Sequence, residues 1–192
     1  MSNNLLYKKY SKELSKMVSN NDFKKMLGNS IENKIIKYSD FENIDDLNDI
    51  LTEPKDYRII LIETQKNTGH WCCLLKNNNC FEWFDSYSLY PDQEFEFISP
   101  EMQKILDEDN KPLSKLLNKF KQNGGKWDYN KIKFQEQKPN INTCGRYCSA
   151  LIYLFLKYNY NLKQFQKYFF NLKKKTNIPY DILICDFTKV LN

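Results

Sequence analysis

Apolar residues in the first quarter of the chain recur every three or four positions, a spacing that is typical of amphipathic helices. We expect one helix over residues 3–18, a short second helix over residues 21–27 that ends at Gly28, and a third over residues 40–51. The N-terminal part of the chain is therefore predicted to be helical.

After residue 51 the pattern changes to one that favours strands. Residues 57–64 are rich in β-branched side chains and predict a buried strand, and residues 70–76 and 80–85 predict two more. The three asparagines at positions 77–79 are typical of a hairpin turn, because asparagine tolerates a positive φ. Residues 131–135 predict a further short strand. We expect these strands to form a small, mostly antiparallel sheet.

Helical spacing returns in the second half of the chain, over residues 99–108, 112–121 and 162–174. Between the last two, the stretch from Thr143 onward is apolar nearly all round, as in a helix buried in a core. Helices that flank a small central sheet, with one helix buried, make an α+β domain.

A chain of 192 residues that is 41% hydrophobic can form one well-filled core. We therefore expect a single domain over residues 1–192, in which residues 1–38 form an N-terminal helical arm. No apolar run approaches the roughly 18 residues that span a bilayer, and the N-terminus lacks the apolar stretch of a signal peptide. We expect a protein that is neither secreted nor embedded in a membrane, with reduced cysteines.

The formal net charge of +5 has two interpretations, which the sequence leaves open. Lysine and asparagine are abundant and arginine occurs only at Arg58 and Arg146, a bias typical of an AT-rich genome. Alternatively, the lysines attract nucleic acid without reading its bases, since they are spread along the chain and densest only at residues 163–175.

One histidine, His70, and six cysteines limit the metal sites that this chain can build. Zinc motifs with two histidines are excluded, and neither Cys72-Cys73 nor the pair Cys144 and Cys148 has the usual C-x-x-C spacing. We therefore expect no metal and no cofactor. Five cysteines are expected to be small packing residues: Cys72, Cys73, Cys80, Cys148 and Cys185.

The predicted hairpin places the histidine beside a carboxylate. If Asn77 and Asn78 form a two-residue loop, His70 lies opposite Asp85, and a register error of one or two residues would place Ser86 or Tyr87 there. A carboxylate at this point fixes the tautomer of the imidazole and stabilises its charged form. A chance cross-strand pair without function is the alternative.

Cys144 directly precedes the helix that is predicted to be buried. A thiol at a helix N-terminus lies at the positive end of the helix dipole, which lowers its pKa, and backbone N–H groups of the first turn can bind an oxyanion. Gly145 leaves room for a substrate backbone to approach. The amide of Gln137, or that of Gln135 as a competing candidate, could complete the oxyanion hole.

Taken in order, six residues resemble the active site of the adenain/Ulp1-like cysteine proteases, a family that includes the adenovirus maturation protease and the SUMO-specific proteases: His70, Trp71, Asp85, Gln137, Cys144 and Gly145. The spacing of seven from glutamine to cysteine is similar to the viral branch. Small size and the lysine and asparagine bias resemble the capsid-maturation proteases of virophages and related double-jelly-roll DNA viruses. The resemblance covers residues 40–160, the expected catalytic core, and implies a papain-related fold with the nucleophile at the N-terminus of the buried helix.

The resemblance implies a role for each of these residues. Cys144 would be the nucleophile, His70 the base, and Asp85 the acid that orients His70. Gln137 would help to hold the oxyanion. Trp71 is similar to the tryptophan that walls a narrow groove, which admits only glycine before the cut. The implied activity is that of an endopeptidase that cleaves Gly-Gly or Gly-x-Gly sites in capsid precursors or other virion proteins.

The same resemblance implies the surroundings of the protein. Adenovirus-type relatives use DNA and a cleaved peptide as activators, so we expect non-specific DNA binding. We expect a monomer in the virion, the host-cell cytoplasm or a viral factory. Three rival functions remain: an isopeptidase that removes a ubiquitin- or SUMO-like modifier, an acetyltransferase with the same triad, and a basic virion protein without enzymatic activity.

Overall fold

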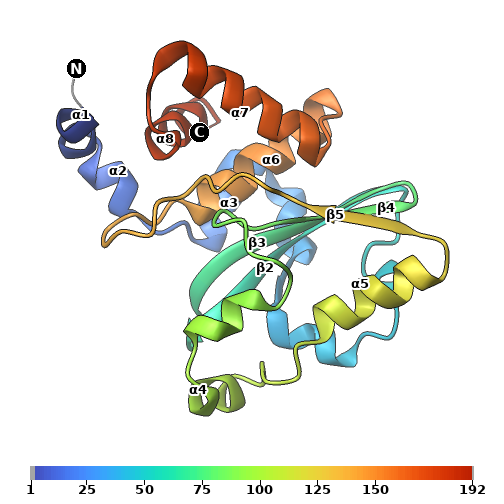
Figure 1. Ribbon diagram of the computed structural model, residues 1–192. Helices are drawn as coiled ribbons and strands as arrows, with labels where there is room; N and C mark the ends of the chain where they lie inside the picture. The colour runs from blue at the N-terminus through green and yellow to red at the C-terminus, as the bar shows by residue number, and fades with distance from the viewer. Residues whose placement is uncertain (1–2, 192) are drawn as a thin grey trace. The chain divides into compact units, whose positions relative to one another are not determined.

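The computed structural model describes residues 3–191, and the chain divides into two compact units (Figure 1). We call residues 33–85 and 89–129 the sheet unit. The remaining residues, up to residue 32, from 86 to 88 and from 130 onward, form the helical unit. The single-domain organisation expected from the sequence stays a prediction.

The sheet unit holds five strands in the order β1-β2-β3-β4-β5. They are β1 (Ile35–Lys37), β2 (Lys55–Gln65), β3 (Thr68–Asn77), β4 (Cys80–Phe84) and β5 (Lys126–Tyr129). The long central ladders, β2 with β3 and β3 with β4, are antiparallel, whereas the short outer pairs are parallel. The predicted strands at 57–64, 70–76 and 80–85 are confirmed, and most of the sheet is antiparallel as expected.

One face of the sheet carries the core of this unit. Alternate residues of the three central strands are buried there because side chains two positions apart point to the same side of a strand. Loops, short 3₁₀ helices and two α-helices cover this face: η2 (Tyr38–Asn43), η3 (Leu47–Asp49), η4 (Gln93–Phe97), α4 (Pro100–Ile105) and α5 (Pro112–Gln122). Residues of the opposite face, such as Ile59 and Cys73, are also fully buried, which explains why the strand sequences are apolar without interruption.

The helical unit is built around one apolar helix, as the sequence predicts. Its elements are α1 (Asn3–Lys9), α2 (Ser11–Ser15), α3 (Asn20–Leu27), η1 (Asn29–Lys34), α6 (Cys144–Tyr158), α7 (Leu162–Thr176) and α8 (Tyr180–Lys189). α6 packs against α3, α7 and α8, and its N-terminal two turns are buried on all sides. Around Phe134, aromatic rings from α6, α7 and α8 fill the interior. The α+β class is thereby confirmed.

Several helices lie where the periodicity places them, with small differences at their ends. The prediction over 21–27 corresponds to α3, with Gly28 at its C-cap at a φ of 91°. α5 and α7 match the predictions over 112–121 and 162–174, and α4 covers part of 99–108. The predicted helix over 3–18 is interrupted at Tyr10, so that α1 and α2 replace one continuous helix.

Two predicted elements are wrong. Residues 40–51 form η2 and η3 instead of an α-helix, because the Asp40 and Asp46 side chains accept hydrogen bonds from the backbone N–H groups of Lys37 and Asn48. Such local side-chain bonds compete with the helical ladder. The predicted strand over 131–135 does not form.

The backbone donors of that segment are satisfied outside any sheet. The N–H groups of Lys131 and Ile132 donate to Oε1 of Gln166, and those of Phe134 and Gln135 donate to the carbonyl oxygen of Ser86. The strand beside β4 is β5, a few residues earlier in the chain. In addition, α8 was not predicted at all, although it packs on α6.

Candidate active site

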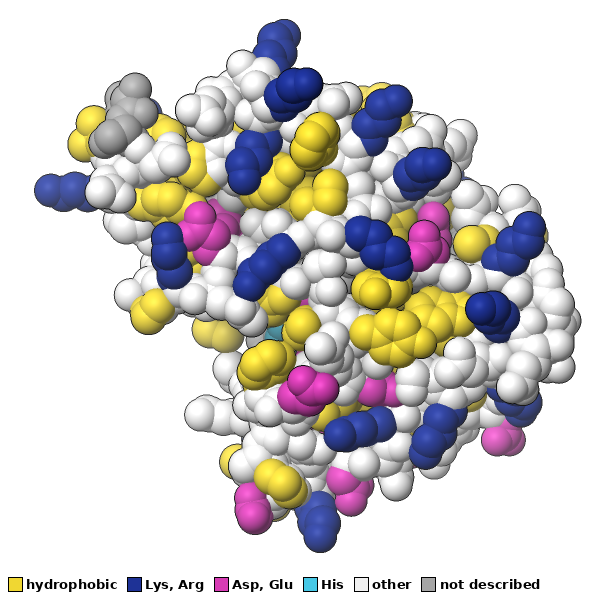
Figure 2. All heavy atoms as spheres, viewed as in Figure 1, with side chains coloured by type: hydrophobic (Ala, Val, Ile, Leu, Met, Phe, Trp, Pro, Cys, Tyr) yellow, Lys and Arg dark blue, Asp and Glu magenta, His cyan; other side chains and the backbone are white. Residues whose placement is uncertain are grey.

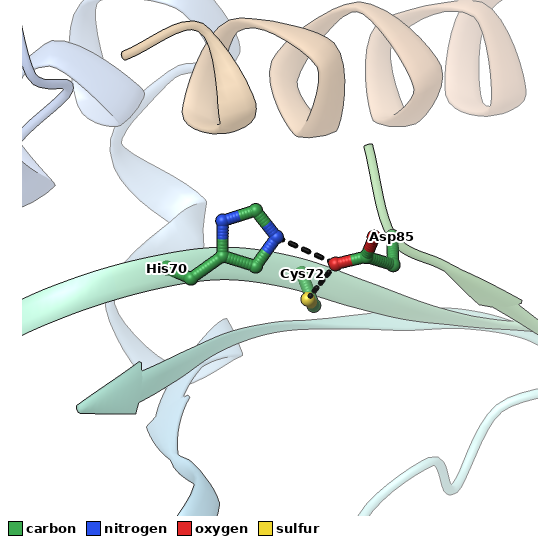
Figure 3. Close-up of side chains that lie close together, drawn as sticks. All are labelled: His70, Cys72 and Asp85. Carbon is green, nitrogen blue, oxygen red and sulfur yellow. Dashed lines mark hydrogen bonds and ion pairs between the residues drawn. The ribbon is translucent and has the colours of Figure 1, made fainter. Parts of the chain in front are cut away.

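β3 and the residue that follows β4 bring the histidine and its predicted acid together (Figure 3). Nε2 of His70 lies 2.5 Å from Oδ2 of Asp85. Asp85 is fully buried, and the side chain of His70 is 14% exposed. The pair therefore joins a carboxylate that water does not reach to an imidazole that is partly exposed.

The hairpin that carries this pair has a different register from the expected one. Asn77 pairs with Cys80, so the two-residue loop is Asn78-Asn79, not Asn77-Asn78. Asn78 adopts the positive φ of 53° that such a turn requires. The expected register was wrong by two residues.

The contact forms nonetheless, because it is diagonal. Continued by one residue beyond β4, the observed register places Asp85 opposite Cys72, and His70 lies two residues from Cys72 on the same face of β3. A diagonal neighbour across a strand pair is within reach of a long side chain. The carboxylate of Asp85 thus contacts both His70 and Cys72. In the second contact, Sγ of Cys72 donates to Oδ2 of Asp85 at 3.2 Å.

Hydrogen bonds and charge keep Asp85 ionised in spite of its burial. Burial alone would raise the pKa of Asp85, but the charge of His70 and the hydrogen bonds from His70, Cys72 and the backbone N–H of Leu89 lower it below its ordinary value. A charged carboxylate only accepts hydrogen bonds, so Nε2 of His70 is the donor. Proton exchange with a reacting group then falls to Nδ1.

Cys72 has a larger part than the packing role expected from the sequence. It is fully buried, as expected, but its thiol also belongs to the hydrogen-bond network of Asp85. The ligand atoms of His70, Cys72 and Asp85 lie within 4.8 Å of one another, so these three side chains could together hold a metal ion such as zinc. The hydrogen bonds between them account for the cluster without one.

Trp71 follows the histidine and lies on the opposite face of β3, where it pairs with Leu61 of β2. It is 7% exposed. Its predicted role as the wall of a glycine-selective groove stays a prediction.

Cys144 is the first residue of α6 and is 8% exposed. The backbone N–H groups of a helix's first turn have no acceptor within the helix, and here the N-cap residue Thr143 does not supply one from its side chain. Its hydroxyl instead donates to Oδ1 of Asp181 at 2.5 Å. The cysteine therefore occupies the position at a helix N-terminus that the sequence predicts.

Asp181, at the start of α8, links the segment that leads into Cys144 to the segment that contains Gln137. Besides Thr143, its carboxylate accepts hydrogen bonds from the backbone N–H of Glu136 and from the hydroxyl of Tyr147. Burial raises its pKa to about 6, although the hydrogen bonds oppose the shift. The sequence analysis missed this residue. An aspartate that follows Pro179 at the start of an apolar stretch was the available signal.

The two candidate glutamines have different environments. Gln135 is 2% exposed, and its amide nitrogen donates to the hydroxyl of Tyr87 and the carbonyl oxygen of Ile141 while its oxygen accepts from Ser86. Gln137 is exposed and its oxygen accepts from Lys133 at 2.7 Å. Among the residues that the structure describes, the amide nitrogen of Gln137 has no acceptor, so Gln137 is the better donor candidate.

Gly145 is required by packing inside the helical unit. A Cβ atom at this position would lie 2.6 Å from Cβ of Val18, well inside contact distance. The close approach of the Val18 segment to α6 thus explains why a glycine follows the cysteine. Contact of Gly145 with a substrate stays a prediction.

The six predicted site residues form two sets. His70, Trp71 and Asp85 belong to the sheet unit, where the first and last are bonded. The other three, Gln137, Cys144 and Gly145, belong to the helical unit.

Basic side chains on the face seen in Figure 2 stand singly among neutral and acidic ones. The last turn of α7, with Lys173, Lys174 and Lys175, is the densest run. No disulfide joins the six cysteines, all of which lie in the described part of the chain. Within residues 3–191 there is no helix of the length and hydrophobicity needed to cross a membrane.

Comparison with known proteins gives one informative relative. Over 152 residues the chain is 37% identical to "Uncharacterized protein V9" of the Sputnik virophage, an alignment that spans 79% of this chain and 82% of that protein. No family model matches the chain, and no solved structure matches it.

Proposed function

The chain belongs to the family of protein V9 of the Sputnik virophage, and for this viral protein we propose the function of a cysteine endopeptidase that cleaves after glycine. The observation that carries the proposal is the bond between His70 and the buried Asp85, formed by the one imidazole in the chain. Cys144 at the N-terminus of α6 supplies a thiol in the setting that activates such nucleophiles.

The proposed reaction begins when Sγ of Cys144 attacks the carbonyl carbon of the glycine that precedes the scissile bond. Its proton passes to Nδ1 of His70, because Nε2 is bonded to Asp85. The backbone N–H of Cys144 and the amide of Gln137 hold the oxyanion. His70 then protonates the leaving amine, and a water molecule, deprotonated by the same nitrogen, releases the acyl group from sulfur.

We extend the proposal to the fold and to specificity. The antiparallel strand pair with the histidine and the helix that starts with the cysteine support a papain-related fold of the adenain type. Trp71 and Gly145 would line a groove for Gly-Gly or Gly-x-Gly sequences. The substrates would be capsid or other virion precursors, processed by a monomer in the virion or in the host cell, with DNA or a peptide as activator and no cofactor.

Mass spectrometry tests this function. Wild type and Cys144→Ala are each incubated with capsid precursors of the same virus, and the products are measured as intact masses. Wild type should cut after glycine, and the variant should lose at least about a thousandfold in rate. Cys80→Ser, which changes a partly exposed cysteine at the far end of the hairpin, is the control and should keep full activity.

Cleavage by Cys144→Ala at the wild-type rate would refute the mechanism. A ubiquitin or SUMO vinyl sulfone provides a second readout of the substrate. If such a probe labels Cys144 while capsid precursors stay intact, the protein is an isopeptidase and not a maturation protease.

A further inference from the structure

A second carboxyl group lies behind Asp85 in the sheet unit. Glu94, in η4, is 5% exposed, and Sγ of Cys72 lies 3.7 Å from its Oε1. The same sulfur lies 3.2 Å from Oδ2 of Asp85. Two carboxyl groups therefore share one thiol, which has a single hydrogen to donate, and the shorter distance assigns that hydrogen to Asp85.

Glu94 lacks the partners that a buried charge needs. Its Oε2 is buried without a hydrogen-bond donor among the described residues, and no lysine or arginine of this part of the chain pairs with it. An ionised carboxylate without donors is very costly in a protein interior, so the group takes up a proton instead. Once protonated, Glu94 changes from an acceptor into a donor.

The charges around Glu94 determine which of the two carboxyl groups, Glu94 or Asp85, holds the proton. Burial raises the pKa of Glu94 well above its ordinary value, and the negative charge of Asp85 raises it further, which outweighs the opposing effects of a backbone hydrogen bond and of the charge of His70. Asp85 itself has a lowered pKa. The other titratable groups that face Glu94 are Cys72 and His70 on β3 and Tyr38 on η2. Of the two carboxyl groups, Glu94 therefore keeps the proton.

We infer that Glu94 is a positioning residue of the site: as a neutral acid, it donates a hydrogen bond to Asp85 and fixes that carboxylate against His70. Its effect on catalysis rests on the proposed function, whereas the hydrogen bond itself does not. With Glu94 neutral, one negative charge faces one imidazole. An ionised Glu94 would add a second charge and bind the proton of His70 too tightly for its transfer to a leaving group.

Because the chain has one histidine, proton NMR of His70 tests this directly, on untagged protein and without any substrate. Glu94→Gln replaces the neutral acid by a neutral amide that can still donate, and should leave the titration midpoint of His70 unchanged. If Glu94 is ionised, the substitution removes a nearby negative charge and lowers the midpoint by about one unit, which would overturn the inference. Glu96→Gln, an exposed position of the same 3₁₀ helix, is the matched control.

A labelling experiment on wild type covers the case in which Glu94→Gln does not fold. With ¹³C-carboxyl glutamate, one resonance should stay at its protonated position after that of Glu108, whose pKa burial raises to about 7, has titrated. If every glutamate has ionised by the time Glu108 has titrated, the inference is contradicted.

Kinetics on a glycine-containing substrate test the positioning role. Glu94→Leu is of similar size but cannot donate, and should lower kcat about tenfold at an unchanged KM, whereas Glu94→Gln should retain the wild-type kcat. Equal kcat in the Leu and Gln variants would show that the hydrogen bond positions nothing. If wild type cleaves nothing, the proposed function fails, while the NMR titrations still decide the protonation of Glu94.

Discussion

In the sheet unit the candidate base, His70, is bonded directly to a buried charge, whereas in the helical unit packing and hydrogen bonds hold the backbone that carries the candidate nucleophile, Cys144. His70 depends on the carboxylate of Asp85, which the protein shields completely from water. The position of Cys144 depends on the start of α6. That part of the helix is held by the hydrogen bond from Thr143 to Asp181 and by the close contact of Gly145 with Val18. The sheet unit thus controls the protonation state of His70, and the helical unit controls the position of Cys144.

The segment before Cys144 shows how hydrogen bonds hold the backbone in the helical unit. The backbone N–H of Asn142 donates to the carbonyl oxygen of Leu14, and its side-chain amide donates to that of Ser15, so that α2 holds the residues leading into α6. Substitutions in the sheet unit should therefore alter rates more than stability. Apart from Cys144 and Gln137, the proposed reacting groups themselves, substitutions in the helical unit should alter stability at least as much as rates.

The largest effect is expected at Asp85. Asp85→Asn keeps the shape of the side chain, but its amide can donate to Nε2 of His70 and so stabilise the wrong tautomer. We expect kcat/KM to fall by about a thousandfold or more, with a far smaller change in the urea midpoint of unfolding. Activity within tenfold of wild type would show that this carboxylate does not orient the base.

Gln137 should have the next largest effect on the rate. Gln137→Ala removes the proposed oxyanion donor and should lower kcat by about a hundredfold without destabilising the protein, since the side chain is exposed. Gln135→Ala is the comparison, because it removes a buried amide that bonds Ser86, Tyr87 and Ile141. If only Gln135→Ala lowers kcat, and does so without lowering stability, the role of oxyanion donor belongs to Gln135.

Asp181 should make stability depend on pH. Its pKa is about 6 in the folded protein and 3.8 ordinarily, so the unfolded chain releases this proton at lower pH than the folded one. The wild type should therefore lose about 3 kcal/mol relative to Asp181→Asn between about pH 4 and 6, and no more above that. Urea unfolding across this range measures the difference, and Asp186→Asn, at an exposed position of α8, is the control. If the stability of wild type relative to Asp181→Asn stays constant or increases as the pH rises, the assignment is contradicted.

The smallest effect is expected at Gly145. Gly145→Ala places a methyl group against Val18 and should destabilise the protein by about 1–3 kcal/mol, measured by urea unfolding. Val18→Gly in the same chain, which removes the clashing Cβ atom, should recover part of this loss. If the double variant is no more stable than Gly145→Ala, the clash is not the cause.

The sequence predicts the parts of the fold in which one pattern dominates. Continuous apolar strands and the apolar helix after Thr143 are found where expected because burial alone determines them. The 40–51 segment has a helical apolar pattern, yet Asp40 and Asp46 bind nearby backbone groups and leave only 3₁₀ turns. Local hydrogen bonds of this kind are harder to recognise in a sequence than apolar periodicity.

The residues of the candidate site could be predicted from the sequence, but the network of hydrogen bonds and charges around them could not. His70 and Asp85 follow from a hairpin count, and their contact survives a register error because a diagonal neighbour is also within reach. Glu94 and Asp181 could not be predicted in the same way. Their roles depend on burial beside Asp85 and beside Thr143, residues that are distant from them in sequence.

The central claim is that His70 activates Cys144, and the alkylation rate of Cys144 tests it most directly. The rate with iodoacetamide is measured between about pH 5 and 9 by peptide mass spectrometry, with Cys80, whose pKa burial raises, as the internal reference. In wild type, Cys144 should react rapidly already below pH 7, and His70→Ala should delay its reaction to the alkaline range while Cys80 is unchanged. Identical Cys144 profiles in wild type and His70→Ala would contradict the account.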